Sequence, residues 1–153
     1  QPPYIVMTVL QTYNANLKNV KKIMKNSTTT GQDELNRVCA KVLPNGKYKG
    51  AFPSDRLPSM KSTHCCILNL DSSGEPGSHW VGVYRTGKAL VVYDSFGRRA
   101  KKILPDLKPR KGMKIANTEL DAEQHILATD CGQRCVAWLM CVYSDGIKEA
   151  LKV

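Results

Sequence analysis

The strongest constraint on the fold is the segment from Cys131 to Tyr143, which is apolar on nearly every side when it is wound as a helix. A surface helix keeps one polar face, so a helix of this kind has to be enclosed by other parts of the domain. The 153 residues give room for one domain with a sizeable core, and a second independent core is not expected. Asp130 stands where an N-cap residue would stand. We therefore predict one domain built around a buried helix.

Short apolar segments that alternate with turn residues predict the elements around this helix. Two strands separated by the tight turn at 86–88 should form a hairpin. The fold class expected is α+β, with a mixed central sheet packed against the buried helix, an N-terminal helical part over about 1–45 and a core over about 50–143. The expected elements are helices at about 14–25 and 33–42, a loop at 44–58, strands at 64–70, 79–85, 89–94 and 113–117, and a short helical turn before Pro105.

The charge balance favours polyanionic partners. Lysine and arginine number 23 against 13 aspartate and glutamate residues, which gives a net charge of +10. One cluster runs from Arg98 to Lys114, and a weaker group of lysines lies between residues 18 and 25. No aromatic residues interleave the main cluster, so binding to nucleic acid would be to backbone phosphates and independent of sequence. Alternatively, the basic residues form a solvated surface that binds no nucleic acid. The candidate phosphate-binding residues are Arg98, Arg99, Lys101, Lys102, Arg110 and Lys111.

The cysteines and the apolar segments indicate the cellular compartment of the protein. Six cysteines occur at irregular spacing without a Cys-x-x-Cys pair, which favours reduced thiols over a disulfide framework or a zinc site. We therefore expect no metal. No apolar run reaches the ~18–20 residues of a membrane span, and the N-terminal residues lack a signal-peptide core. The chain is predicted to be neither secreted nor associated with a membrane.

A nucleophilic site can be built at the start of the buried helix. Cys131 would lie in the first turn, where the helix dipole favours a thiolate. The predicted hairpin would bring His79, at the start of one strand, beside Asp94, at the end of the next, as base and orienting acid. Gln124 could donate its amide to an oxyanion together with the backbone N–H of Cys131. Each residue alone is more often structural, but this combination at compatible element boundaries is much rarer.

Three motifs carry a family resemblance. They are Gly77-Ser78-His79-Trp80, then Val91-Val92-Tyr93-Asp94-Ser95-Phe96-Gly97, then Gln124 seven residues before Cys131 in Asp130-Cys131-Gly132. Over about residues 50–143 the chain resembles the adenovirus-type maturation cysteine proteases (adenain), within a larger group that includes the SUMO-deconjugating proteases. It is also similar to the compact proteases of virophages and of polinton-like and adintovirus-like elements.

The resemblance implies roles and context. His79 would be the general base, Asp94 its orienting acid where adenain has Glu, Cys131 the nucleophile, Gln124 the oxyanion donor, and Trp80 a neighbour of bound substrate. The implied function is a viral endopeptidase that cleaves capsid or other virion precursors at small residues, often glycine. No cofactor would be needed for the chemistry, while DNA, a viral peptide or both could activate the enzyme. A monomer in the virion and infected cell, in the nucleus or a cytoplasmic virus factory, is expected.

Other functions remain open at this point. A deconjugating isopeptidase for a ubiquitin-like modifier has the same catalytic order, but that group more often has its Gln six residues before the Cys. A basic nucleic-acid-binding domain with a structural Cys131 belongs to a different class. It would keep its DNA affinity after Cys131→Ala and would react like an ordinary thiol. An acyltransferase on the same scaffold is a more distant alternative.

Overall fold

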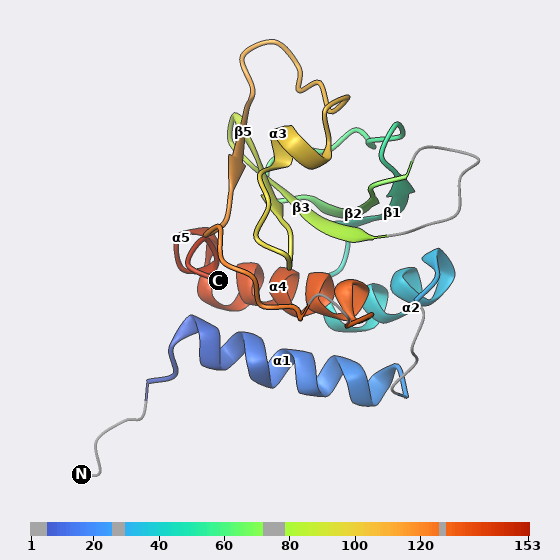
Figure 1. Ribbon diagram of the computed structural model, residues 1–153, viewed down its shortest axis with the longest axis vertical. Helices are drawn as coiled ribbons and strands as arrows, with labels where there is room; N and C mark the ends of the chain where they lie inside the picture. Colours follow the sequence, from blue (N-terminus) through green and yellow to red (C-terminus); the bar gives the residue numbers. More distant parts are fainter. Residues whose placement is uncertain (1–5, 26–29, 72–78, 126–127) are drawn as a thin grey trace.

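A computed structural model describes residues 6–25, 30–71, 79–125 and 128–153 and has the predicted α+β class (Figure 1). A mixed five-stranded sheet lies against helices within these ranges. The elements in chain order are α1 (Val9–Ile23), α2 (Gln32–Val42), β1 (Tyr48–Pro53), β2 (Cys65–Asn69), β3 (Trp80–Thr86), β4 (Ala89–Tyr93), α3 (Ala100–Ile103), β5 (Lys114–Asn117), α4 (Cys131–Asp145) and α5 (Ile147–Ala150).

The strands follow one another across the sheet in the order β1-β2-β3-β4-β5. The central pairs β2–β3 and β3–β4 are antiparallel, and the outer pairs β1–β2 and β4–β5 are parallel. The predicted hairpin is confirmed, because Thr86 pairs with Ala89 and Gly82 with Tyr93. The start of β3 and the end of β4 therefore meet at the same edge of the sheet, which places His79 and Asp94 together.

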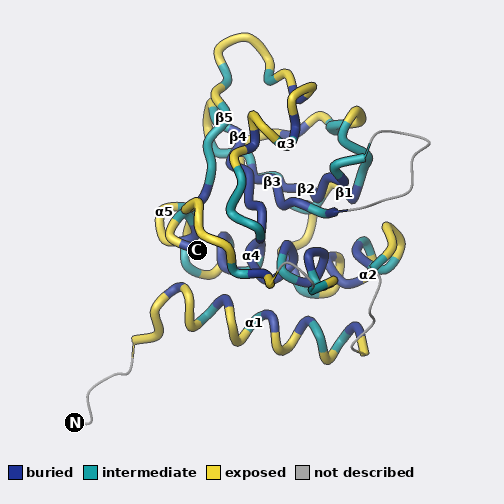
Figure 2. The backbone as a smooth tube through the Cα atoms, viewed as in Figure 1, coloured by how far each residue is buried: buried dark blue, intermediate teal, exposed yellow. Residues whose placement is uncertain are grey.

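Alternate side chains of the strands serve two hydrophobic clusters, one on each face of the sheet. In β2, Cys65 and Ile67 join the cluster with α1, α2 and α4, whereas Cys66 and Leu68 join the cluster with α3. Helix α4 lies between the sheet and α1, and Figure 2 shows the buried course of α4 beside the mostly exposed outer side of α1. This double cover explains why the α4 sequence is apolar nearly all round, and the predicted buried helix is confirmed.

The loop predicted over 44–58 is wrong in part, because it contains β1. The glycines and prolines of this segment favour a loop locally. Pairing with β2 overrides that preference, and the register shifts between Tyr48 and Ala51, where Gly50 has φ of 129°. Such a conformation is open to glycine and strained for other residues. The strand thus depends on a tertiary contact that the local sequence does not reveal.

Helix α1 begins at Val9, earlier than the predicted start near residue 14. The Thr8 hydroxyl accepts a hydrogen bond from the backbone N–H of Gln11, and the Gln11 side chain accepts one from the N–H of Thr8. This capping box satisfies two of the free donors of the first turn. The short helix α5 was not predicted either. No helix in the described part of the chain is long and apolar enough to cross a membrane.

Candidate active site

The fold brings three of the predicted catalytic residues together. His79 directly precedes β3, Asp94 directly follows β4, and Cys131 is the first residue of α4. In Figure 1 the start of β3 lies above the end of α4 at which the chain enters the helix. The backbone of Trp80 hydrogen-bonds the Cys131 sulfur, which fixes the strand against the helix at this point. The hairpin and one helix terminus therefore define the site.

The pair formed by His79 and Asp94 is buried and short. His79 Nε2 lies 2.6 Å from Asp94 Oδ1, with side-chain exposures of 8% and 0%. Asp94 Oδ2 also accepts hydrogen bonds from the Arg98 backbone N–H at 3.0 Å and from Arg98 Nε at 2.8 Å. Burial acts to raise the pKa of Asp94, but the hydrogen bonds from His79 and Arg98 outweigh it and lower that pKa to about 2. Asp94 is therefore a carboxylate throughout the neutral range.

His79 also hydrogen-bonds the Cys131 thiol. Since Nε2 is engaged by Asp94, Nδ1 is the ring nitrogen left for this contact. Burial opposes the charged imidazole, but the hydrogen bonds with Asp94 and Cys131 raise the pKa of His79. Burial likewise opposes the thiolate, yet the His79 hydrogen bond and backbone N–H groups of Trp80 and Gly132 lower the pKa of Cys131. Opposite shifts of this kind favour a thiolate–imidazolium pair.

Cys131 differs from the other cysteines of the chain. All six are described, buried and free. Burial raises the pKa of the remaining five, which are Cys39, Cys65, Cys66, Cys135 and Cys141. Only for Cys131 do hydrogen bonds outweigh burial and lower the pKa. Among the six cysteines, Cys131 is therefore the one whose surroundings favour a thiolate. The described residues contain no group of histidine, cysteine or acidic side chains arranged to hold a metal ion.

An aromatic ring, which the sequence interpretation missed, supports the His79 imidazole. The Phe96 ring stacks on His79 with 4.8 Å between ring centroids and 22° between ring planes, and the Arg98 guanidinium lies 5.1 Å from the Phe96 centroid. Between them, Gly97 has φ of 71°, and a Cβ there would lie 2.7 Å from the backbone of Asp121. Only glycine fits this turn. The turn returns Arg98 to Asp94, so the strand-end motif positions both the acid and its cationic partner.

Gln124 is held between the end of β4 and the segment that enters α4. Its Oε1 accepts a short hydrogen bond from Ser95 Oγ, and its Nε2 donates to the Ala128 carbonyl at 2.6 Å. The backbone N–H of Gln124 donates to the Ser95 carbonyl at 3.0 Å. The amide nitrogen carries two hydrogens, of which the Ala128 contact uses one. Ser95 was not predicted as a site residue. The oxyanion role of Gln124 stays a prediction.

Trp80 connects the site to the segment before α2. Its indole Nε1 donates to the Thr30 carbonyl at 3.1 Å. A Cβ at Gly132 would lie 3.2 Å from side-chain atoms of both Thr30 and Leu35, so glycine allows this segment to pack closely on the first turn of α4. The side chain of Trp80 is half-buried, and its backbone hydrogen-bonds the Cys131 sulfur. The role of Trp80 as a neighbour of bound substrate stays a prediction.

Asp130 occupies the N-cap position of α4, as predicted. Its carboxylate makes no capping hydrogen bond. It pairs instead with Lys21 Nζ at 2.8 Å and with Arg134 Nε at 2.9 Å. Two cations that reach the carboxylate from α1 and from the next turn of α4 compete with the backbone donors.

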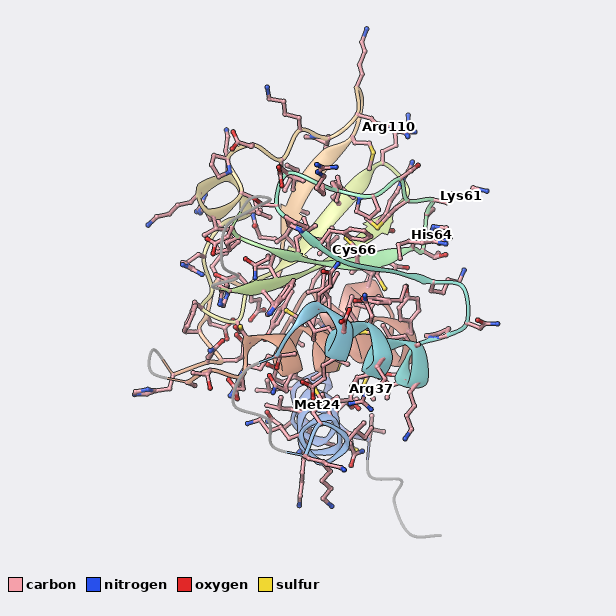
Figure 3. The ribbon with its side chains drawn as sticks, turned by 90° about the vertical axis from the view of Figure 1, so that its right-hand side faces the viewer. Met24, Arg37, Lys61, His64, Cys66 and Arg110 are labelled. Atoms are coloured by element: carbon pink, nitrogen blue, oxygen red, sulfur yellow. The ribbon has the colours of Figure 1, made fainter. Side chains whose placement is uncertain are left out.

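The predicted phosphate-binding residues divide into two groups. Arg98 is bound to Asp94 and half-buried at the site. The exposed members of the cluster lie on α3 and the following loop, on the face of the sheet opposite α4 (Figure 1), and Figure 3 labels Arg110 at the side of the molecule farthest from α1. These exposed members are Arg99, Lys101, Lys102, Arg110 and Lys111. Any polyanion bound by them would lie across the sheet from Cys131.

Glu123, next to Gln124, predicts a pH-dependent stability. Burial, reinforced by the charges of Asp121 and Asp94 and opposed by Arg134, raises the pKa of Glu123 to about 8 from 4.5. Between these two values the native state keeps a proton that the unfolded chain has lost. The stabilisation of the native state by protonated Glu123 is therefore complete below pH 4.5 and is lost as the pH rises to about 8. Glu123→Gln should therefore raise the free energy of unfolding relative to wild type, by an amount that grows as the pH rises through this window. The difference should reach about 1–3 kcal/mol, because solvent partly screens the group.

The measurement is urea unfolding of both proteins from pH 5 to pH 9. A difference that is constant with pH would show that Glu123 ionises normally in the native state. Glu119→Gln, an exposed change on the same segment, is the control for the loss of one negative charge.

Comparison of the sequence with known protein families and with curated proteins found no match.

Proposed function

We propose that this protein is a cysteine endopeptidase with an adenain-like fold, in which Cys131 is the nucleophile, His79 the general base and Asp94 the orienting acid. The observation that carries the proposal is the position of one buried imidazole between a carboxylate and a thiol at a helix N-terminus. A nucleophile, a base within hydrogen-bond reach and a third group that orients the base are the parts that covalent catalysis needs.

The first half of the reaction forms an acyl-enzyme. The Cys131 thiolate attacks the carbonyl carbon of the scissile bond, and the negative charge passes to the carbonyl oxygen. The backbone N–H of Cys131 and the second amide hydrogen of Gln124 would stabilise this oxygen. The tetrahedral intermediate then collapses, the C–N bond breaks, and His79 gives its proton to the leaving amine. A thioester between Cys131 and the substrate remains.

The second half releases the product. His79, now neutral, takes a proton from water as the water attacks the thioester carbonyl, and the thiolate leaves with the imidazolium restored. Asp94 keeps the proton of His79 on the ring nitrogen that faces the carboxylate, so Nδ1 points at the reacting atoms. Phe96 limits rotation of the imidazole, since the two rings stack. Arg98 holds the carboxylate in place.

The proposed substrates are viral capsid or other virion precursors, cleaved beside small residues such as glycine. The motif resemblance motivates this choice, and one structural feature supports it. Cys131 is only 9% exposed, so bulky side chains next to the scissile bond would hinder approach of the carbonyl carbon. We further propose that the enzyme acts as a monomer in the virion and the infected cell, and that DNA bound by the exposed basic residues of α3 and its following loop stimulates it.

Two alternatives are tested by the same protein preparation. A deconjugating isopeptidase would cleave a ubiquitin-like modifier from a lysine side chain and leave free peptides intact. The spacing of seven residues between Gln124 and Cys131 favours the endopeptidase. A non-catalytic DNA-binding domain would bind DNA equally well as wild type and as Cys131→Ala, with no cleavage of any substrate.

The test is covalent capture followed by turnover. A peptide vinyl sulfone with glycine next to the electrophile is expected to modify Cys131 of the wild type at one equivalent, identified by mass spectrometry, and to leave Cys131→Ser unmodified. A library of glycine-containing peptides, assayed with and without double-stranded DNA at low salt, is expected to be cleaved by the wild type only. Modification of several cysteines at similar rates, with no peptide cleaved, would contradict the proposal.

A further inference from the structure

Helix α1 contacts the residue before the nucleophile and the residue before the orienting acid. Lys21 Nζ lies 2.8 Å from Asp130 Oδ2, and Asp130 directly precedes Cys131. The Tyr13 hydroxyl lies 2.6 Å from the Tyr93 hydroxyl, and Tyr93 directly precedes Asp94. Helix α1 runs along the side of α4 away from the sheet (Figure 1). Helix α1 thus contacts the residues that precede both Cys131 and Asp94.

Arg134 joins these two contacts into one network. Its Nε donates to Asp130 Oδ1 at 2.9 Å, and its Nη1 donates to the Tyr13 hydroxyl at 3.3 Å. Tyr13 and Tyr93 are fully buried, and the side chains of Asp130 and Arg134 are each 14% exposed. The Lys21 side chain is 38% exposed, whereas the rest of the network is largely shielded from water, so the charges of Asp130 and Arg134 act more strongly than charges on the surface do.

The charges of the network determine whether it favours or disfavours the thiolate form of Cys131. A carboxylate on the residue beside Cys131 disfavours a thiolate by like-charge repulsion. Lys21 and Arg134 together place two positive charges on this one carboxylate, which leaves a net charge of about +1 on the side chains around the residue that precedes the nucleophile. The pairs also hold the Asp130 backbone, whose carbonyl accepts the hydrogen bond of the Arg134 N–H in the first turn of α4.

We propose that Lys21 and Arg134 are positioning residues that neutralise and anchor Asp130, so that α1 is part of the machinery that activates Cys131. This inference rests on the proposed function, because it assigns a regulator to the same nucleophile. The two cations act through Asp130 and touch neither the substrate nor the reacting atoms. Loss of a cation is expected to disfavour the thiolate, and loss of the carboxylate is expected to favour it.

The other ionisable groups around the network are the same in wild type and in the variants of Lys21 and Asp130, so they do not cause differences between these proteins. His79 and Cys135 interact electrostatically with Cys131, and Asp94 interacts with both His79 and Cys135. Glu123 interacts electrostatically with Arg134 and with the tyrosine pair. Because the pKa of Glu123 is about 8, reaction rates are best fitted between pH 4 and pH 7.5, where Glu123 mostly keeps its proton.

The experiment follows iodoacetamide alkylation of Cys131 with pH, resolved by mass spectrometry of the labelled peptide. Lys21→Met is expected to raise the apparent pKa of the reaction by about half a unit or more, and Asp130→Asn to lower it by a similar amount. Lys21→Arg, which keeps the charge, should behave as wild type. Lys22→Met is the matched control, because it removes an equal charge from the exposed side of α1.

A merely structural role would slow alkylation without moving the apparent pKa in opposite directions. If Lys21→Met and Asp130→Asn both keep the wild-type pH profile, or both move it the same way, the inference is overturned. The proposed function fails differently: the wild type itself would then react as an ordinary thiol, and His79→Ala would leave its profile unchanged. Thermal unfolding of each variant establishes that folded proteins are compared.

Discussion

Replacing His79 with alanine is expected to slow peptide hydrolysis about 10³-fold or more at pH 7. In the proposed mechanism the imidazole stabilises the Cys131 thiolate and gives a proton to the leaving amine. Without it, burial of Cys131 is no longer offset by the hydrogen bond that lowers its pKa. Both the concentration of thiolate and the protonation of the leaving group are lost together. Alkylation of Cys131 needs the thiolate but no proton for a leaving amine. Loss of His79 should therefore slow alkylation less than it slows peptide hydrolysis.

The measurement is kcat/KM for the best peptide found with the wild type, alongside the alkylation rate of Cys131. His64→Gln is the control, since His64 directly precedes β2, whose first residue pairs with Tyr84 near the end of β3, whereas His79 precedes the start of β3. It should retain wild-type activity. A His79→Ala enzyme that keeps more than about a tenth of the wild-type kcat/KM would exclude His79 as the base.

Asp94→Asn is expected to lower kcat about 10²–10⁴-fold. The asparagine amide cannot stabilise an imidazolium as a carboxylate does, and it can favour the wrong tautomer of His79. The hydrogen bond with Asp94 is among the interactions that raise the pKa of His79, so that pKa should fall in the variant. The active form needs the imidazolium, so the alkaline limb of the pH–rate profile should move to lower pH. The wild-type profile should show no ionisation of Asp94 itself above about pH 4, because the pKa of its carboxyl is about 2.

Asp94→Glu is the informative partner of this variant. It keeps the carboxylate, and the resembling viral proteases carry Glu at this position, so activity within about tenfold of wild type is expected. Full pH–rate profiles of kcat for the three proteins separate charge from side-chain shape. Equal activity of Asp94→Asn and wild type, with an unmoved alkaline limb, would rule out an orienting role for this carboxylate.

The meeting of His79 and Asp94 could be predicted from the sequence, because a tight turn between two strands fixes which residues lie opposite each other. The start of the buried helix was equally visible, since an apolar run of that length has a clear beginning. Local patterns therefore sufficed to bring three side chains to one edge of the sheet. The same patterns gave the α+β class and the central strands.

Features that depend on contacts distant in sequence could not be predicted. Strand β1 forms because β2 offers it a partner, although Gly50 and Pro53 within it favour a loop. The Asp130 side chain turns away from the helix backbone because Lys21, more than a hundred residues earlier, reaches it. Arg98 appeared to belong to a basic surface cluster. Its spacing of four residues from Asp94, across a glycine that adopts positive φ, was the signal that could have placed it at the site.

The most direct test of the central claim is the pH dependence of alkylation of all six cysteines in the native wild-type protein, each followed by mass spectrometry. If Cys131 and His79 form a thiolate–imidazolium pair, Cys131 should react far faster than the other five, with a rate that persists well below pH 7 and collapses in His79→Ala. Reaction of Cys131 with an ordinary thiol profile centred near pH 8.5, at a rate unaffected by loss of His79, would contradict the claim.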